Sequence, residues 1–226
     1  MCGRFTLIRD IGSIARAFDV PAPDAFKVQP RYNVAPSQNI LTLIRDKDTT
    51  PTHLALLRWG LIPAWAKDES IGNRMINARA ESLAEKPSFK RLLNSKRCLI
   101  IADGFYEWKS EPGSKHKTPM YITLEDDEPF TFAGLWDTWH NPVGETLQTC
   151  TIITTDPNEV MASIHNRMPV IIPSVAREEW LAPQNHDTAA LQQLLQPYRY
   201  SEMKVRPVSR LVNNTSNDSA EVLLAQ

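Results

Sequence analysis

Seventeen prolines are spread over the 226 residues of the chain and divide it into short segments. Proline interrupts both helices and central strands, so we expect many short elements rather than a few long ones. Runs that alternate or continue in apolar residues predict strands between the prolines. The expected strands cover residues 39–45, 53–59, 97–102, 120–124, 131–135, 148–154 and 204–208, and a polar loop at 46–50 joins the first two.

Short helices are expected among these strands. They cover residues 79–85, 88–93, 157–163, 174–181 and 187–195, and Asp156 followed by Pro157 is a typical beginning for the third. The strands do not alternate strictly with the helices, which argues against a doubly wound parallel sheet. We therefore predict an α+β fold with one domain over residues 1–226, built on a curved, largely antiparallel, barrel-like sheet flanked by short helices.

The composition is typical of a soluble globular protein, with 42% hydrophobic and 23% charged residues. No apolar run approaches the ~20 residues that span a bilayer, and the first residues lack the apolar segment of a secretory signal. The three cysteines, Cys2, Cys98 and Cys150, are widely spaced, which argues against a zinc site or a disulfide framework. We expect a cytoplasmic protein with no metal, no other cofactor and no membrane partner.

Charge is distributed unevenly, although the net charge is only −1. Residues 1–120 carry 19 Lys and Arg against 12 Asp and Glu, whereas residues 121–226 carry 6 against 14. Such a chain can fold with one basic face that attracts phosphates, or its two halves can intermix and leave no patch. The sequence leaves both outcomes open.

Cys2 is the first candidate for chemistry, because of its position more than its type. Removal of Met1, which a small second residue favours, would turn Cys2 into a free 1,2-aminothiol. An unperturbed terminal amine has a pKa of about 7.7–8.0 and a thiol one of about 8.5, so both are partly nucleophilic at neutral pH. Such a pair condenses with an aldehyde to a Schiff base, which the thiol then closes to a thiazolidine. The alternative is that Cys2 simply follows the start codon.

Three other segments carry candidate catalytic side chains. Glu107 lies among aromatic residues, where the pKa of a carboxyl can rise toward the range used in proton transfer; the alternative is a solvated hairpin carboxylate. His165 is the residue type that most readily moves protons at neutral pH, unless it is a structural histidine. Asn77 can orient an amine or thiol and Arg79 can hold a phosphate, unless both only cap a helix and form a surface ion pair.

Two features suggest contact with nucleic acid. Trp59 and Trp65 flank a Gly/Pro turn, where exposed rings stack on bases at about 1–3 kcal/mol each, unless both belong to the core. The segment 86–97 contains basic residues and no acidic one, which suits either a stripe that follows phosphates or a solvated helix face. Its basic residues are Lys86, Lys90, Arg91, Lys96 and Arg97.

Taken together, these segments resemble the SRAP family (SOS response-associated peptidase), whose members are also called abasic site processing proteins. The resemblance spans nearly the whole chain in the family's order. The matching stretches are Met1-Cys2-Gly3-Arg4-Phe5, Arg31-Tyr32-Asn33-Val34-Ala35-Pro36, Trp59-Gly60-Leu61-Ile62-Pro63, Asn77-Ala78-Arg79-Ala80-Glu81, Asp103-Gly104-Phe105-Tyr106-Glu107-Trp108, Ile164-His165-Asn166-Arg167-Met168-Pro169, and Val208-Ser209 with Val212-Asn213.

This resemblance implies a function and roles for individual residues. The partner would be single-stranded DNA that contains abasic sites, and Cys2, as the mature N-terminus, would form a covalent thiazolidine crosslink with the ring-opened sugar. The crosslink would shield the lesion during the DNA damage response. Asn77 would position Cys2, Glu107 would relay protons, and His165 would assist opening of the sugar ring.

The resemblance also implies an interface with DNA and a setting for it. We expect a monomer that acts on nucleoid-associated DNA in the cytoplasm. The residues expected to contact DNA are Arg4, Trp59, Trp65, Arg79 and Arg167.

Two other functions fit the same residues. One is a cysteine autopeptidase that cuts only the bond after Met1, with Cys2 activated by His165 or with Glu107 acting alone. The other is a module that binds single-stranded DNA through its tryptophans and basic residues and makes no covalent bond.

Mass spectrometry of a Glu107→Ala variant tests the autopeptidase hypothesis. Self-cleavage predicts that Met1 stays on the variant and is lost from the wild-type protein, because the variant lacks the group that moves protons at the cleaved bond. Loss of Met1 from both proteins would point instead to a host aminopeptidase.

Overall fold

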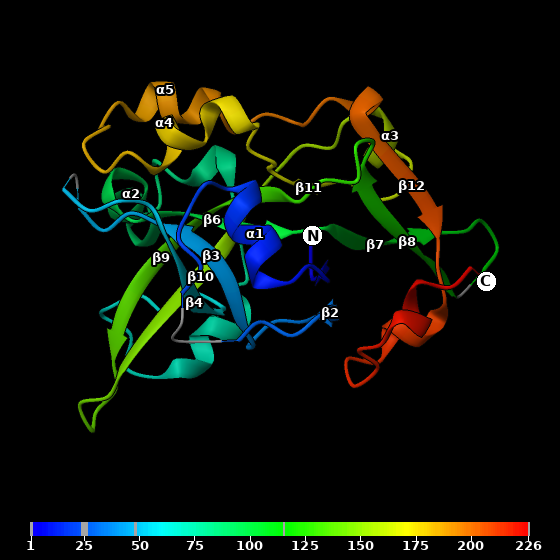
Figure 1. The fold of residues 1–226 in the computed structure, drawn as a ribbon, viewed down its shortest axis with the longest axis horizontal. Helices are drawn as coiled ribbons and strands as arrows, with labels where there is room; N and C mark the ends of the chain where they lie inside the picture. Colours follow the sequence, from blue (N-terminus) through cyan, green and yellow to red (C-terminus); the bar gives the residue numbers. More distant parts are fainter. Residues whose placement is uncertain (1, 24–26, 48, 115, 226) are drawn as a thin grey trace.

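Five strands close into a barrel in the computed structural model, which describes residues 2–23, 27–47, 49–114 and 116–225 (Figure 1). In their order around the barrel they are β10 (Thr146–Thr155), β4 (His53–Trp59), β3 (Asn39–Ile44), β6 (Arg97–Ala102) and β9 (Phe130–His140). Neighbouring strands are antiparallel except for β10 and β4, which are parallel. Pairing between β9 and β10 completes the ring.

The chain also forms a second sheet, in which all neighbouring strands are antiparallel. Its strands pair in the order β12 (Met203–Pro207), β8 (Lys117–Leu124), β7 (Gly104–Ser110), β1 (Arg4–Leu7) and β2 (Arg31–Val34). Only Asp103 separates β6 of the barrel from β7 of this sheet. Glycine is required at position 104, because a Cβ there would lie 2.4 Å from the ring of Tyr121.

Short helices and two short strands complete the fold. The α-helices are α1 (Ile11–Ala17), α2 (Pro87–Ser95), α3 (Glu159–Ala162), α4 (Arg177–Leu181) and α5 (Thr188–Gln193), and α4 and α5 lie together at one end of the molecule (Figure 1). The strands β5 (Asn77–Arg79) and β11 (Met168–Pro169) both pair with β10. Within the described residues, six 3₁₀ helices cover Glu69–Arg74, Ala80–Ser82, Ser174–Ala176, Tyr200–Glu202, Arg210–Asn213 and Ala220–Leu223. No helix in the described parts of the chain has the length and apolar character needed to cross a membrane.

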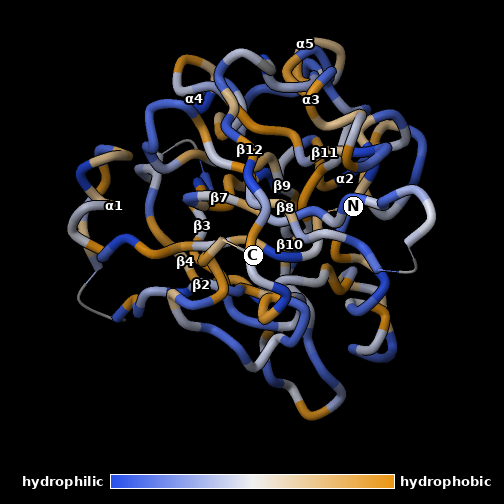
Figure 2. Tube along the Cα trace, turned by 90° about the vertical axis from the view of Figure 1, so that its right-hand side faces the viewer, coloured by the Kyte–Doolittle hydropathy of each residue, from blue (hydrophilic) through white to orange (hydrophobic). Residues whose placement is uncertain are grey.

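The barrel strands are buried on both faces. Successive side chains of a strand point to opposite faces, and in β3 the side chains of Leu41 and Leu43 pack with the helices, whereas those of Ile40 and Ile44 pack with the second sheet. Every residue of β6 is buried, which is why its sequence is a continuous apolar run rather than an alternating one. Figure 2 shows apolar strands at the centre of the molecule and hydrophilic segments around them.

The α+β class and the barrel-like, largely antiparallel sheet are confirmed by this architecture. The expected strands at 53–59 and 97–102 coincide with β4 and β6. The helix expected over 79–85 is wrong: Arg79 ends strand β5, and only the 3₁₀ turn Ala80–Ser82 follows. Arg79, the first residue of this segment, pairs with Thr154 of β10, and this pairing overrides the local helical pattern there.

The beginning of the third expected helix is also wrong. Asn158, not Asp156, is the N-cap of α3, and its side chain accepts a hydrogen bond from the Met161 backbone at 2.9 Å. The helix is correspondingly shorter than expected and covers only Glu159–Ala162. Both Asp156 and Asn158 are good capping residues, so the sequence did not distinguish them.

A substitution at Gly134 in β9 tests the packing of the barrel. A Cβ at this position would lie 2.3 Å from Cδ1 of Ile100 and 2.8 Å from Sγ of Cys98. We expect Gly134→Ala to lower the free energy of unfolding by about 1–3 kcal/mol, because the surrounding barrel residues must move. Urea unfolding monitored by tryptophan fluorescence measures this change.

Gly12→Ala in α1 is the matched control. Its added Cβ would lie 3.2 Å from Oδ1 of Asp10, an exposed side chain that caps α1 and would need to shift by only a few tenths of an ångström. We expect no loss of stability, or a gain of up to about 1 kcal/mol, since alanine favours helices more than glycine does. Equal losses in the two variants would contradict this description of the barrel.

Candidate active site and nucleic-acid interface

Cys2 lies fully buried just before β1. It packs in the same apolar cluster as Phe5 and Trp59, and Nδ2 of Asn77 donates a hydrogen bond to its carbonyl oxygen at 2.9 Å. Burial, with the negative charge of Glu107 nearby, raises the pKa of the Cys2 thiol far above its ordinary value. The thiol is therefore protonated at neutral pH, and it needs a base before it can act as a thiolate.

Pairing within the second sheet brings Glu107 to Cys2. Arg4 of β1 lies opposite Tyr106 of β7, so the chain just before β1 runs beside the residue that follows Tyr106. Only 2% of Glu107 is exposed. Burial raises the pKa of the Glu107 carboxyl, and His165 lies close enough to interact with it. A carboxyl with a raised pKa is better suited to exchange protons near neutral pH.

His165 comes from the segment after α3. Its backbone N–H donates to the carbonyl of Met161 at 2.8 Å, and its Nδ1 accepts a hydrogen bond from the backbone N–H of Arg167 at 3.1 Å. A neutral imidazole whose Nδ1 accepts a hydrogen bond carries its proton on Nε2. His165 therefore offers an Nε2–H donor in the neighbourhood of Glu107.

Asn77 is the first residue of β5, and parallel pairing places it opposite Ile152 of β10. Its Nδ2 donates to the carbonyl oxygen of Cys2, whereas its buried Oδ1 has no hydrogen-bond partner among the residues that the structure describes. A buried acceptor without a partner is costly, so this oxygen is suited to receive a donor from a ligand or a reacting group. Asn77 thus hydrogen-bonds to Cys2, Glu107 lies near Cys2, and His165 lies near Glu107, so the four predicted catalytic residues come from four separate segments and form one cluster.

Of the arginines expected to contact DNA, Arg4 is already held by the protein and Arg79 is exposed. Nη1 of Arg4 donates to Oδ1 of Asn33 at 2.9 Å and to the carbonyl of Val212 at 2.8 Å. The guanidinium of Arg4 also lies 5.9 Å from the centre of the Trp108 ring. Arg79, at the end of β5, is accessible to a phosphate.

Arg167 is held by two carboxylates. Its Nη1 and Nη2 donate to the two oxygens of Glu81 at 2.8 and 2.9 Å, and Nη1 also reaches Asp156 at 2.8 Å. Nη2 donates in addition to the carbonyl of Thr154 at 2.7 Å, and the side chain is only 12% exposed. A DNA phosphate would have to displace one of these acceptors before it contacted Arg167.

The prediction that Trp59 stacks on bases is wrong. Trp59 is the last residue of β4 and is fully buried, with its Nε1 donating to the carbonyl of Ile76 at 2.9 Å and its ring 5.4 Å from that of Phe5. No face of this ring is accessible to a base. Trp65, by contrast, is 66% exposed, so its ring is accessible for stacking.

The basic segment 86–97 does not form a continuous surface stripe. Arg97 is 3% exposed and donates to two backbone carbonyls at 2.6 Å, and burial lowers its pKa to about 10. The ammonium of Lys96 lies 3.7 Å from the centre of the Trp136 ring, and Arg91 pairs with Asp137 at 2.7 Å. Only Lys86 and Lys90 of this segment are exposed without such contacts in the described structure.

Sequence reasoning missed Asn33, which organises the chain around Arg4. Asn33 is fully buried, and its Nδ2 donates to the carbonyls of Val212, Asn214 and Asn217 at 3.2, 3.0 and 2.8 Å. These contacts fold the C-terminal segment onto the second sheet. The motif at residues 31–36 was the available signal, but nothing in it revealed a partner so distant in sequence.

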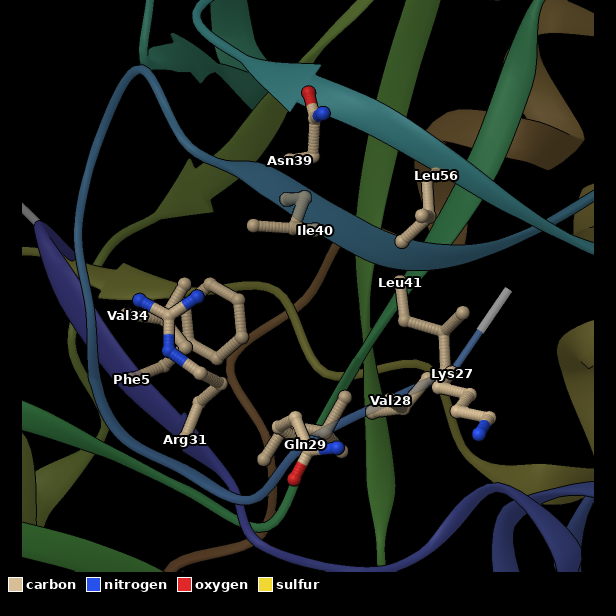
Figure 3. A pocket seen from close by; sticks show the side chains of 11 residues that line it. Phe5, Lys27, Val28, Gln29, Arg31, Val34, Asn39, Ile40, Leu41 and Leu56 are labelled. Atoms are coloured by element: carbon tan, nitrogen blue, oxygen red, sulfur yellow. The ribbon is translucent and has the colours of Figure 1, made fainter. Parts of the chain in front are cut away.

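A pocket of about 260 Å³ lies apart from the four candidate catalytic residues (Figure 3). Its walls include Phe5, Val34 and Ile40, and Lys27 and Gln29 add polar groups. Cys2, Asn77, Glu107 and His165 are not among the residues that line it. The largely apolar pocket and the polar cluster around Cys2 are therefore separate features.

Comparison with known proteins defines the family to which the chain belongs. The sequence profile of the family described as SOS response associated peptidase (SRAP) matches residues 1–215. The chain belongs to the SRAP family. It is 54% identical to the abasic site processing protein YoqW of Bacillus subtilis (strain 168), with 99% of each chain covered. It is 34% identical to the abasic site processing protein HMCES of Xenopus tropicalis, covering 89% of this chain and 68% of that protein.

Solved structures share the fold. A crystal structure of a protein from Bacteroides thetaiotaomicron superposes with a TM-score of 0.89 at 27% identity, with 100% of both chains covered. A phage-related protein from Bordetella bronchiseptica gives a TM-score of 0.72 at 30% identity, over 92% of this chain and 95% of that one.

The raised pKa of Glu107 predicts how stability depends on pH. Because the carboxyl titrates at a higher pH in the folded state than the value of about 4.3 in the unfolded state, the folded state binds more protons between the two. The contribution of Glu107 to stability is therefore fully present below the pKa that the carboxyl has in the unfolded state. It is lost as the pH rises through the pKa that the carboxyl has in the folded state. Relative to a Glu107→Gln variant, the wild-type protein should lose free energy of unfolding as pH rises from about 4 toward neutrality.

Urea unfolding of both proteins across this pH range measures the difference. Glu128→Gln is the control, because that side chain is 62% exposed and should show no such trend against the wild-type protein. A Glu107→Gln difference that stays constant with pH would contradict burial as the cause.

Proposed function

We propose that this protein acts on abasic sites in single-stranded DNA and captures their aldehyde as a thiazolidine on Cys2. The cluster around Cys2 carries the proposal: an amide on its carbonyl at 2.9 Å, with a buried carboxyl and a histidine beside it. Relatives named abasic site processing proteins support the choice of substrate. The reaction requires the free amine of Cys2, so we further propose that Met1 is removed.

The first step is condensation of the Cys2 amine with the ring-opened sugar. The nitrogen lone pair attacks the aldehyde carbon, a proton reaches the oxygen, and water leaves to form a C=N bond. His165 offers Nε2–H to the sugar oxygen as the ring opens and as the hydroxyl leaves. Glu107 takes the proton that the amine releases and returns it to the departing hydroxyl, so the carboxylate is regenerated before the second step; a carboxyl whose pKa is raised by burial suits this exchange.

The second step closes the ring. The thiol sulfur adds to the carbon of the C=N bond, the π electrons move to nitrogen, and the S–H proton is transferred to that nitrogen. Because the thiol is protonated when buried, Glu107 is the group that accepts and returns this proton. The balance of both steps is one water released, with no oxidation or reduction.

Ring closure explains why a thiol is paired with the amine. A Schiff base at an abasic site withdraws electrons and promotes β-elimination, which breaks the strand. Closing the thiazolidine removes the C=N bond, so the DNA strand persists and the lesion is shielded. This outcome suits a protein of the DNA damage response that acts on nucleoid-associated DNA in the cytoplasm.

The DNA strand is held by exposed aromatic and basic groups. Trp65 stacks on a base through its exposed ring, and Arg79 pairs with a phosphate. Arg4 keeps its protein contacts and offers its remaining donors to the strand. One monomer supplies all of these residues.

A denaturing gel tests the covalent step. Wild-type protein incubated with an abasic oligonucleotide should give a band of lower mobility that survives denaturation, and the intact oligonucleotide should give none. Cys2→Ala should abolish the band, because it removes the sulfur that closes the ring. Cys150→Ala is the control, since it removes another fully buried thiol and should leave the band in place.

Binding without a band in the wild-type protein would favour the non-covalent alternative, with an affinity that falls as salt is raised. A cleaved rather than shielded abasic strand would contradict the proposed role of ring closure.

A further inference from the structure

Glu81 links the two segments that carry Asn77 and His165. It lies two residues beyond the end of β5, the strand that begins with Asn77. Arg167 lies two residues after His165, and its guanidinium binds both carboxylate oxygens of Glu81, at 2.8 and 2.9 Å. Paired contacts of this kind fix orientation as well as distance.

The register of β10 explains why these residues meet. Arg79 of β5 lies opposite Thr154 of β10 in parallel register, so the residues that follow both strands emerge at the same edge. The carbonyl of Thr154 accepts from Arg167 at 2.7 Å, and Asp156 accepts at 2.8 Å. Four of the five guanidinium donors of Arg167 are therefore used inside the protein.

Fixing Arg167 also fixes the ring of His165. The backbone N–H of Arg167 donates to Nδ1 of His165 at 3.1 Å, and this contact determines which ring nitrogen of the neutral imidazole carries the proton. A shift of the Arg167 backbone would weaken the contact and release the ring. Glu81 holds that backbone indirectly, through the buried guanidinium.

We infer that Glu81 is a positioning residue that acts through Arg167. It keeps His165 in one tautomer and ties the segment of His165 to the segment that carries Asn77. This inference rests on the proposed function for its catalytic consequence, but not for its structural one. It also assigns Arg167 a role within the protein.

Asp156 provides a matched control on the same guanidinium. Glu81→Gln and Asp156→Asn each remove one negative charge next to Arg167, so both change the attraction of DNA in the same direction. Only Glu81 makes the paired contact and lies on the segment of Asn77, whereas Asp156 is 77% exposed and makes one contact. A purely electrostatic role therefore predicts similar effects for the two variants.

The catalytic test measures the rate of adduct formation at saturating abasic oligonucleotide, together with the half-saturating concentration. Glu81→Gln should slow the rate on the order of tenfold, because His165 loses its fixed geometry, while half-saturation stays equal to that of Asp156→Asn. Asp156→Asn should keep the rate within about twofold of the wild-type protein. Equal rates in the two variants would overturn the inference, as would tighter DNA binding by Glu81→Gln without any loss of rate.

A second measurement does not depend on the reaction. Nitrogen-15 NMR of the five histidines reports which ring nitrogen carries the proton, and His165→Gln identifies the signal of His165. The wild-type protein and Asp156→Asn should show the Nε2–H tautomer, and Glu81→Gln should show a mixture. An unchanged His165 signal in Glu81→Gln would overturn the inference. Absence of any adduct in the wild-type protein would defeat the proposed function, while the NMR result would still decide the role of Glu81.

Should Glu81→Gln fail to fold, Glu81→Asp supplies the same two measurements. It keeps the charge but shortens the side chain by one methylene, so the paired contact with Arg167 is lost while the electrostatics are kept. We expect the same mixture of His165 tautomers and a slower rate. A wild-type tautomer with a wild-type rate in this variant would overturn the inference.

Discussion

Parallel pairing along β10 is the interaction on which both the barrel and the candidate site depend. Near its middle, β10 pairs in parallel with β4 as part of the barrel; a few residues later it pairs in parallel with β5 and antiparallel with β11. The backbone hydrogen bonds of these pairs fix Asn77 opposite Ile152 and Arg79 opposite Thr154. Asn77 is therefore held by a strand paired with the barrel, and Glu107 by β7 of the second sheet. Strands of this kind give the precision that positioned chemistry requires.

The second requirement is the burial of ionisable and polar groups near Cys2. Burial is unfavourable for a charged group, and at Arg97 the protein compensates for it, because the buried guanidinium donates to backbone carbonyls. Around Cys2 the compensation is incomplete, since Oδ1 of Asn77 has no partner among the described residues and the pKa values of Cys2 and Glu107 are both raised. A buried acceptor without a partner, beside groups whose pKa values are raised, is typical of a functional site.

Sequence patterns were accurate where local physics decides the structure. The apolar run at 97–102 became the buried strand β6, and the segment 53–59 became β4. They failed where tertiary pairing overrides local preference. The segment after Asn77 has a helical pattern, yet its backbone hydrogen-bonds to β10, and Trp59 lies beside a Gly/Pro turn, yet the barrel buries it completely. Likewise, the basic residues from 86 to 97 form a stripe in sequence, but Arg97 points inward.

The sequence by itself determined the family, the strand segments and the residue types available for chemistry, because motifs and apolar runs are properties of consecutive residues. Only the tertiary structure decided which of these residues meet. Cys2, Asn77, Glu107 and His165 lie on four segments whose contacts depend on strand register, and register is set by hydrogen bonds between strands far apart in the chain. The same long-range pairing brought Glu81 to Arg167, a contact between residues that no local pattern connects.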